Sequence, residues 1–376
     1  MAALTSFNEF VGNDESVQQV RTAIAAGRLP HSLLITGPLG AGKYTLAIML
    51  AQTLNCERQP RDLLSNGISL ATFCGVCANC TRIAEATALS PLIETAVAAR
   101  DEMREVDKKE TRILIQTHPD VLVVPPDPPQ LLIKLGQVRS VIHSAQRAPS
   151  EAPRKVYIFT AAQFMKEAAN SLLKLLEEPP PYAHLILLAE NPGELLPTIR
   201  SRCGVVRLGQ VPAEEMEMVL AERRPEWKPA QRALVARLSE GAVGRALGFD
   251  IAAYQAARTD ALVILRGAVA DTDHSALFRM TESYRAGAEG QVKTSTMLSA
   301  LASLLQDLLS ILSGVPERVR NVDIRPELDK ISGNVDFAWI ERAVVGMDKV
   351  RSGMRRNLLR SLALDAFAEE MAGVKR

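Results

Sequence analysis

A glycine-rich turn between an apolar run and a helical stretch constrains the fold more than any other feature. The apolar run is Leu33–Thr36, the turn is Gly37–Lys43, and a helical pattern follows over residues 44–54. Strand, glycine loop and helix in this order form a phosphate-binding loop, where backbone N–H groups, a lysine and the helix N-terminus face phosphate oxygens. The candidate nucleotide-binding residues are Gly37, Gly40, Gly42, Lys43 and Thr45.

This loop departs from the working pattern at two places. A Ser or Thr that helps to hold magnesium should follow the lysine, but Tyr44 stands there and Thr45 comes one residue late. The expected acid-bearing strand, 155–159, is followed by Thr160–Gln163, which contains no carboxylate. We therefore expect no ATP hydrolysis with Mg²⁺. Whether the loop still binds ATP, or is a glycine turn without a ligand, stays open.

The rest of the chain divides by its periodicity. Apolar runs at 121–124, 155–159 and 185–188 alternate with helical segments, which predicts a parallel α/β sheet. The β pattern ends near residue 208. The predicted domains are an α/β domain (1–207) with a charged helical insertion (about 85–112), a small helical domain (208–250) and a C-terminal helical domain (251–376).

Four of the five cysteines form a group typical of metal binding. Cys74, Cys77 and Cys80 are spaced by three, and Cys56 lies upstream at the end of the predicted helix. Four thiolates complete a closed tetrahedral Zn²⁺ site, so we predict a structural zinc module over about 56–80. A redox pair or simple packing are the alternatives. Cys203 stands apart and is interpreted as a small buried residue.

The composition excludes several protein classes. The 376 residues carry a net charge of +1, 47% are hydrophobic and 23% are charged, which argues against a polybasic protein and against general disorder. No signal-peptide pattern is visible at the N-terminus. The most apolar long stretch, 299–315, contains Gln306 and Asp307 and is expected to be too short and too polar to span a bilayer. We predict a cytoplasmic protein without a membrane partner.

Several ordered motifs together resemble one family. They are Gly27–His31, the cysteine group, His118–Asp120, Ala169–Pro179 and Ser201–Cys203, with a weaker echo at Arg356–Leu358. In this set the chain is similar to the clamp-loader branch of the AAA+ proteins, and within it to the delta-prime type of bacterial DNA polymerase III subunit. The resemblance implies an AAA+ domain with a zinc module, a lid domain and a C-terminal helical collar.

The resemblance also implies roles for two arginines. Taken from composition alone, Arg202 is a surface arginine in a salt bridge. In the family, however, this arginine is the finger that completes the ATP site of an adjacent motor subunit. Arg245 falls where these proteins carry their second sensor.

A non-catalytic subunit is then the expected function. Its partners would be the gamma/tau motor subunits and the delta subunit, with the sliding clamp and primed DNA reached through the complex. The alternatives are an ATP-hydrolysing gamma/tau-type motor or other AAA+ ATPase, and a zinc-stabilised interaction module unrelated to replication.

Overall fold

The computed structural model describes residues 4–65, 67–128, 130–269, 279–281, 287–355 and 360–372. The echo at Arg356–Leu358 lies outside these residues. The chain forms two compact units, the first made of Met1–Pro212 and Gly241–Arg245, the second of Ala213–Glu240 and Ala246–Arg376. A separate lid domain at 208–250 and a collar at 251–376 stay predictions.

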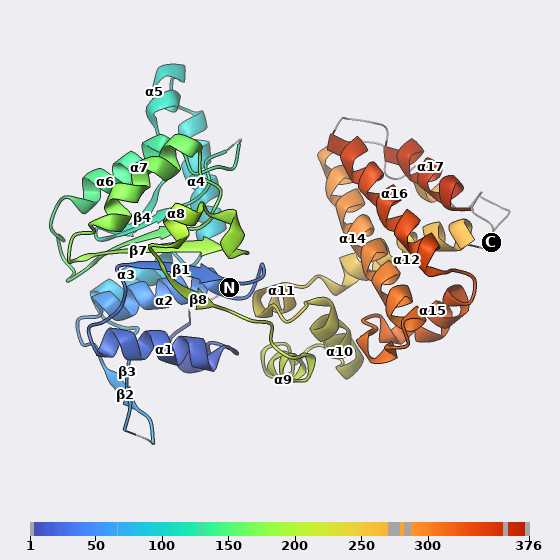
Figure 1. The fold of residues 1–376 in the computed structure, drawn as a ribbon, viewed down its shortest axis with the longest axis horizontal. Helices are drawn as coiled ribbons and strands as arrows, with labels where there is room; N and C mark the ends of the chain where they lie inside the picture. The colour runs from blue at the N-terminus through green and yellow to red at the C-terminus, as the bar shows by residue number, and fades with distance from the viewer. Residues whose placement is uncertain are drawn as a thin grey trace. The chain divides into compact units, whose positions relative to one another are not determined.

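A six-stranded sheet in the order β4-β5-β6-β7-β1-β8 organises the first unit (Figure 1). All neighbouring strands are parallel except β4 and β5, which are antiparallel. The predicted α/β fold class with a helical C-terminal part is confirmed. The strands are β1 (Ser32–Thr36), β4 (Ile115–His118), β5 (Val121–Val124), β6 (Lys155–Phe159), β7 (Ala183–Ala189) and β8 (Gly204–Arg207).

Helices cover both faces of this sheet, which explains why its central strands read as continuous apolar runs. Alternate residues of β1 enter different cores: Leu33 and Ile35 join one, and Leu34 joins the other. The first core contains side chains of α1, α2 and α3, and the second contains side chains of α6 and α7 (Figure 1). The helices are α1 (Asp14–Ala25), α2 (Lys43–Asn55), α3 (Ala78–Glu85), α6 (Leu135–Ala145) and α7 (Lys166–Glu177).

The predicted insertion is helical and forms α4 (Leu89–Asp101) and α5 (Glu105–Glu110). Leu92, Ile93 and Ala96 of α4 pack against the first core. Arg100 at the end of α4 donates a 2.5 Å hydrogen bond to Asp127, whose side chain is only 2% exposed. The other elements are η1 (Phe7–Glu9), the hairpin β2 (Arg61–Leu63) and β3 (Ser69–Ala71), η2 (Pro192–Glu194), α8 (Pro197–Arg200) and α11 (Val243–Leu247).

The second unit is helical throughout its described residues. Its core buries a polar network, in which Arg258 pairs with Asp323 and the buried Asp307 accepts hydrogen bonds from the backbone and side chain of Asn321. The elements are α9 (Ala213–Arg223), α10 (Pro229–Leu238), α12 (Ile251–Val269), α14 (Gly287–Leu312), η3 (Pro316–Arg318), η4 (Val322–Ile324), α15 (Arg325–Ser332), α16 (Phe337–Arg355) and α17 (Arg360–Ala372).

One stretch of the described helices, Lys293–Leu312, is long and apolar enough to cross a membrane by length and composition alone. It extends further towards the N-terminus than the shorter stretch considered in the sequence. Half of it is buried inside the unit, and Leu301, Leu304 and Leu308 are fully covered in the helical core. A core helix therefore accounts for its apolar character.

Candidate functional site

The glycine turn forms a loop between β1 and α2, as the sequence predicts. Gly40 and Gly42 have φ values of +83° and +88°, a region that L side chains rarely adopt. A Cβ atom at Gly37 would lie 2.5 Å from the carbonyl oxygen of Leu208. Glycine is thus required at each of these three positions by backbone geometry.

Lys43 is held by the loop itself. Its Nζ atom donates hydrogen bonds to the carbonyl oxygens of Gly37 (2.5 Å) and Pro38 (2.8 Å). Burial lowers the pKa of Lys43, and the nearby carboxylates of Glu190 and Glu194 oppose this effect. Glu190 directly follows β7, the strand beside β1. The sequence analysis expected an acid after β6 and therefore missed Glu190, which is the first residue after β7.

Tyr44 points into the protein rather than into the loop. Its hydroxyl donates a 2.7 Å hydrogen bond to the carbonyl oxygen of Ala86, just beyond α3, and its ring packs against the first core. Burial raises the pKa of Tyr44. The residue that replaces the expected magnesium ligand is therefore part of the packing between α2 and α3. Thr45, the next residue of α2, is half-buried.

The segment after β6 contributes polar groups to the protein's own backbone network. The N–H of Thr160 donates to Val124 O (3.1 Å), and Gln163 O accepts from the N–H of Ile133 (2.8 Å). The Gln163 side chain reaches Glu194 (3.3 Å). This segment joins neighbouring elements and, as its sequence requires, adds no carboxylate to the loop.

A distant segment packs on the glycine loop. The N–H of Gly244 donates a 2.8 Å hydrogen bond to Gly40 O. A Cβ atom at Gly40 would lie 2.9 Å from the backbone nitrogen of Arg245. The backbone of the expected second-sensor residue is thus beside the loop.

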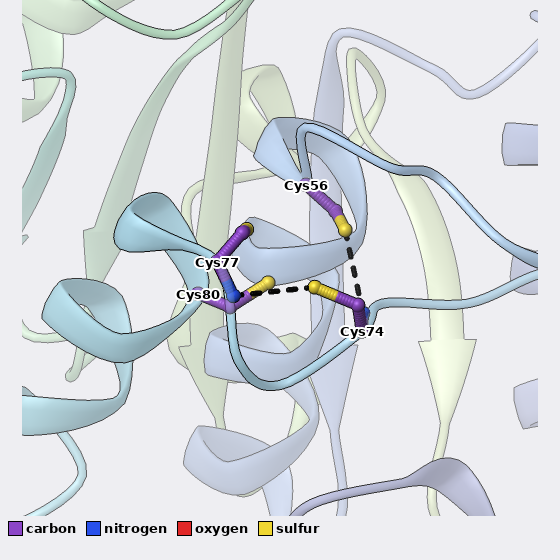
Figure 2. A group of neighbouring side chains, drawn as sticks. All are labelled: Cys56, Cys74, Cys77 and Cys80. Carbon is purple, nitrogen blue, oxygen red and sulfur yellow. Dashed lines mark hydrogen bonds between the residues drawn. The ribbon is translucent and has the colours of Figure 1, made fainter.

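The four predicted metal-binding thiols converge, as Figure 2 shows. The Sγ atoms of Cys56, Cys74, Cys77 and Cys80 lie within 4.8 Å of one another, and three of the residues are buried. In a ZnS₄ tetrahedron with Zn–S distances of about 2.3 Å, the sulfurs lie about 3.8 Å apart. The arrangement can therefore hold one metal ion with small adjustments.

Local structure explains why these thiols meet. Cys56 ends α2 and Cys77 caps α3, which also carries Cys80. The N–H of Cys74 donates to the sulfur of Cys56, and the N–H of Cys77 donates to the sulfur of Cys74, both at 3.3 Å. Burial acts against ionisation of Cys74, but N–H groups of Val76 and Cys77 and hydrogen bonds with neighbouring thiols lower its pKa to about 7. Burial raises the pKa of Cys80.

The His118–Asp120 motif connects this cysteine group to the sheet. His118 Nε2 contacts Asn79 Oδ1 in α3 at 3.0 Å, and its Nδ1 accepts from the N–H of Asp120 at 3.1 Å. The Asp120 carboxylate accepts three backbone hydrogen bonds of 2.8 to 2.9 Å from residues 150–152. The motif therefore fastens α3 and a surface loop to the strand ends.

Arg202 lies on a short turn after α8. Its guanidinium donates to Thr198 O (2.7 Å) and to Glu177 Oε1 (2.5 Å), and its side chain is 33% exposed. Cys203 lies outside the thiol group, donates to Ile199 O at 3.3 Å and has its pKa raised to about 11 by burial. From its composition alone, the sequence predicted a surface arginine in a salt bridge, and the structure shows this arrangement with Glu177, a partner that the sequence did not name.

Comparison with known proteins identifies the family. The family described as "DNA polymerase III, delta subunit" matches residues 12–212, more than half of the chain. The chain belongs to this family. It is thus a member of the DNA polymerase III clamp-loader family, whose relatives named below carry different subunit names.

Three relatives show how far the similarity extends. The chain is 29% identical to subunit tau of Escherichia coli K12 over 64% of its own length and 32% of the relative. It is 32% identical to subunit delta' of Pseudomonas aeruginosa over 46% of its own length and 41% of the relative. It is 31% identical to subunit delta' of Bacillus subtilis over 54% of its own length and 49% of the relative. The chain spans from 32% to 49% of these relatives' lengths.

Proposed function

We propose that this chain is a non-catalytic clamp-loader subunit of the delta-prime type. The observation that carries this proposal is the orientation of Tyr44. Its hydroxyl is bonded to Ala86 O in the protein interior, so the position that should help to hold magnesium serves packing instead. The absence of a carboxylate in Thr160–Gln163 supports the same conclusion.

Arg202 is proposed to act in trans as an arginine finger for a neighbouring motor subunit's ATP. Its exposure and its rigid attachment support this role, because Ile199 beside it is fully buried and anchors the turn. An arginine finger contributes roughly 10³ to 10⁵ in rate. A chain without chemistry of its own can therefore control hydrolysis by the assembly.

The cysteine group is proposed to hold one structural Zn²⁺. Four sulfur ligands leave no open position for a substrate, so the metal would stabilise the fold rather than take part in a reaction. Cys56, Cys74, Cys77 and Cys80 supply the ligands.

The proposed partners are the gamma/tau motor subunits and the delta subunit, with sliding clamp and primed DNA engaged through the complex. The second, helical unit is the proposed site of assembly. A net charge of +1 fits shared rather than solitary DNA binding. We place the protein in the cytoplasm.

Arg202→Ala tests the finger in a loader reconstituted with this chain's own partners. The variant should assemble normally and lose at least about 100-fold in ATPase rate stimulated by DNA and clamp. Arg200→Ala changes an exposed arginine at the end of α8, two residues before Arg202; it is the matched control and should retain the rate. An unchanged rate in Arg202→Ala would remove the finger assignment.

A gamma/tau-type motor is the second candidate, favoured by the similarity to tau and by Glu190. The carboxylate of Glu190 acts on Lys43 from the end of the neighbouring strand. In a motor, this acid would have to replace the missing acid after β6. ATP turnover by the isolated chain separates the two candidates.

A further inference from the structure

The guanidinium of Arg202 is held on two sides by groups from different elements. Thr198, on α8, accepts from Nη1 through its carbonyl oxygen at 2.7 Å. Glu177, the last residue of α7, accepts from Nη2 through Oε1 at 2.5 Å. These contacts use one hydrogen on each terminal nitrogen. Nη1 also lies 3.5 Å from Ser201 Oγ. A guanidinium has five N–H donors, so two, the one on Nε and the second on Nη2, remain for another acceptor.

Both holding groups stand on rigid supports. Glu177 ends an amphipathic helix whose Leu172 and Leu176 are buried, and three prolines follow Glu178. Thr198 belongs to the turn anchored by the fully buried Ile199. The backbone positions of both acceptors are therefore set by the fold, while the ion pair itself lies at the surface.

We infer that Glu177 is a positioning residue for Arg202. This inference rests on the proposed finger function. A donor that is already oriented in the resting protein needs no reorganisation when charge develops on a phosphate in the transition state. Glu177 would hold one N–H group of Arg202 and Thr198 a second, and the N–H groups that remain would be directed to a neighbouring subunit's nucleotide.

The Glu177 carboxylate also offsets the positive charge of Arg202. This offset would favour the opposite role, in which Glu177 restrains Arg202 from acting on a phosphate. Two features favour positioning. The pair is between a third and a half exposed, so solvent screens the charge offset. The Thr198 carbonyl fixes the second side of the guanidinium without adding a negative charge. The two roles predict opposite effects of removing Glu177.

The test is steady-state ATPase kinetics of the reconstituted loader with Glu177→Ala, Glu177→Gln and Arg202→Ala. Glu177→Ala should lower kcat about tenfold and change KM for ATP less than about twofold, because the motor subunit itself binds ATP. Glu177→Gln keeps a hydrogen-bond acceptor, so its kcat should fall about threefold or less. Glu178→Gln removes an adjacent carboxylate and should match the unmodified loader.

A double variant connects the effect to the arginine. Glu177→Ala in the Arg202→Ala background should lower the rate by less than about twofold, because the arginine to be positioned is gone. An equal tenfold loss in both backgrounds would mean that Glu177 acts elsewhere and would overturn the inference. Matching thermal unfolding midpoints of the variants would exclude a folding defect.

The outcomes also distinguish failure of the inference from failure of the proposed function. If Arg202→Ala lowers the ATPase rate of the loader and Glu177→Ala leaves it unchanged, the positioning role is overturned and the finger assignment stands. A higher ATPase rate in Glu177→Ala would identify the Glu177 carboxylate as a restraint on Arg202 and would also overturn the positioning role. An unchanged Arg202→Ala would remove the finger, and the positioning role with it.

Discussion

The backbone N–H of Gly244 donates a 2.8 Å hydrogen bond to the carbonyl oxygen of Gly40 and joins the 241–245 segment to the glycine loop. Gly40 has a φ of +83°, and a Cβ atom on Gly40 would lie 2.9 Å from the backbone nitrogen of Arg245. Any side chain at position 40 therefore meets both an unfavourable backbone conformation and a close backbone neighbour.

Gly40→Ala should lower the free energy of unfolding by about 2 to 3 kcal/mol, because the strain of a positive φ and the displaced segment add. Gly27 is the matched control, since it has a φ of +64° and no atom within 4 Å of an added Cβ. Gly27→Ala should cost only about 1 kcal/mol. Urea denaturation of both variants measures the difference. Equal losses would mean that the Arg245 contact relaxes without cost.

The isolated chain should not turn over ATP when Mg²⁺ is present. Tyr44 cannot act as the small hydroxyl ligand, and Lys43 already donates to Gly37 and Pro38. A coupled assay of phosphate release measures this directly, with Lys43→Ala as the control for contaminating ATPase. Turnover that disappears in Lys43→Ala would establish a motor and overturn the delta-prime proposal.

Purified protein should contain about one zinc per chain. Cys77→Ser should lose the metal and unfold at lower denaturant concentration, because metal binding and folding of the site are coupled. Cys203→Ser, outside the thiol group, should keep it. Elemental analysis of protein prepared under reducing conditions without chelators is the measurement. Stoichiometry near zero in that preparation would contradict the prediction.

His184 should make the fold sensitive to acid. The residue is 5% exposed, stacks on His31 with ring centroids 5.2 Å apart and bonds Pro30 O through Nδ1. Burial, aided by the charges of His31 and Arg154, lowers the pKa of His184 to about 4. The unfolded value is about 6.5. Between these values the unfolded chain binds more protons, so stability decreases as pH falls through this window.

The loss attributable to His184 should reach about 2 to 3 kcal/mol between pH 7.5 and 4.5. His184→Phe removes the titration and should show a correspondingly smaller loss, whereas the exposed His143→Gln should behave like the unmodified protein. Urea unfolding across this pH range is the measurement. An undiminished loss in His184→Phe would assign the acid sensitivity to other groups.

The sequence predicts the central strands well and the outer ones poorly. The strands at 121–124 and 155–159 have the expected bounds because burial on both faces gives continuous apolar runs. The edge strand β4 is buried only at its two end residues, the edge strand β8 has one buried residue, and the hairpin strand β2 is exposed at all three positions. Edge and exposed strands lack the apolar signal, so their sequences do not separate them from loops.

The candidate site was predictable where its residues are close in sequence. The cysteine group and glycine loop follow from spacing alone. The Glu177–Arg202 ion pair and the effect of Glu190 on Lys43 depend on which strands and helices become neighbours. Spacing does not encode that adjacency. The direction of the Tyr44 hydroxyl likewise depends on where α3 packs.

The path of the chain limits how this protein can be dissected genetically. It leaves the first unit at Pro212, returns for Gly241–Arg245 and leaves again, so no single cut separates the units. A fragment ending at Pro212 would lack Gly244 and leave the Gly40 carbonyl without that donor. Nucleotide affinities measured on such a truncation would describe an altered loop rather than the native one.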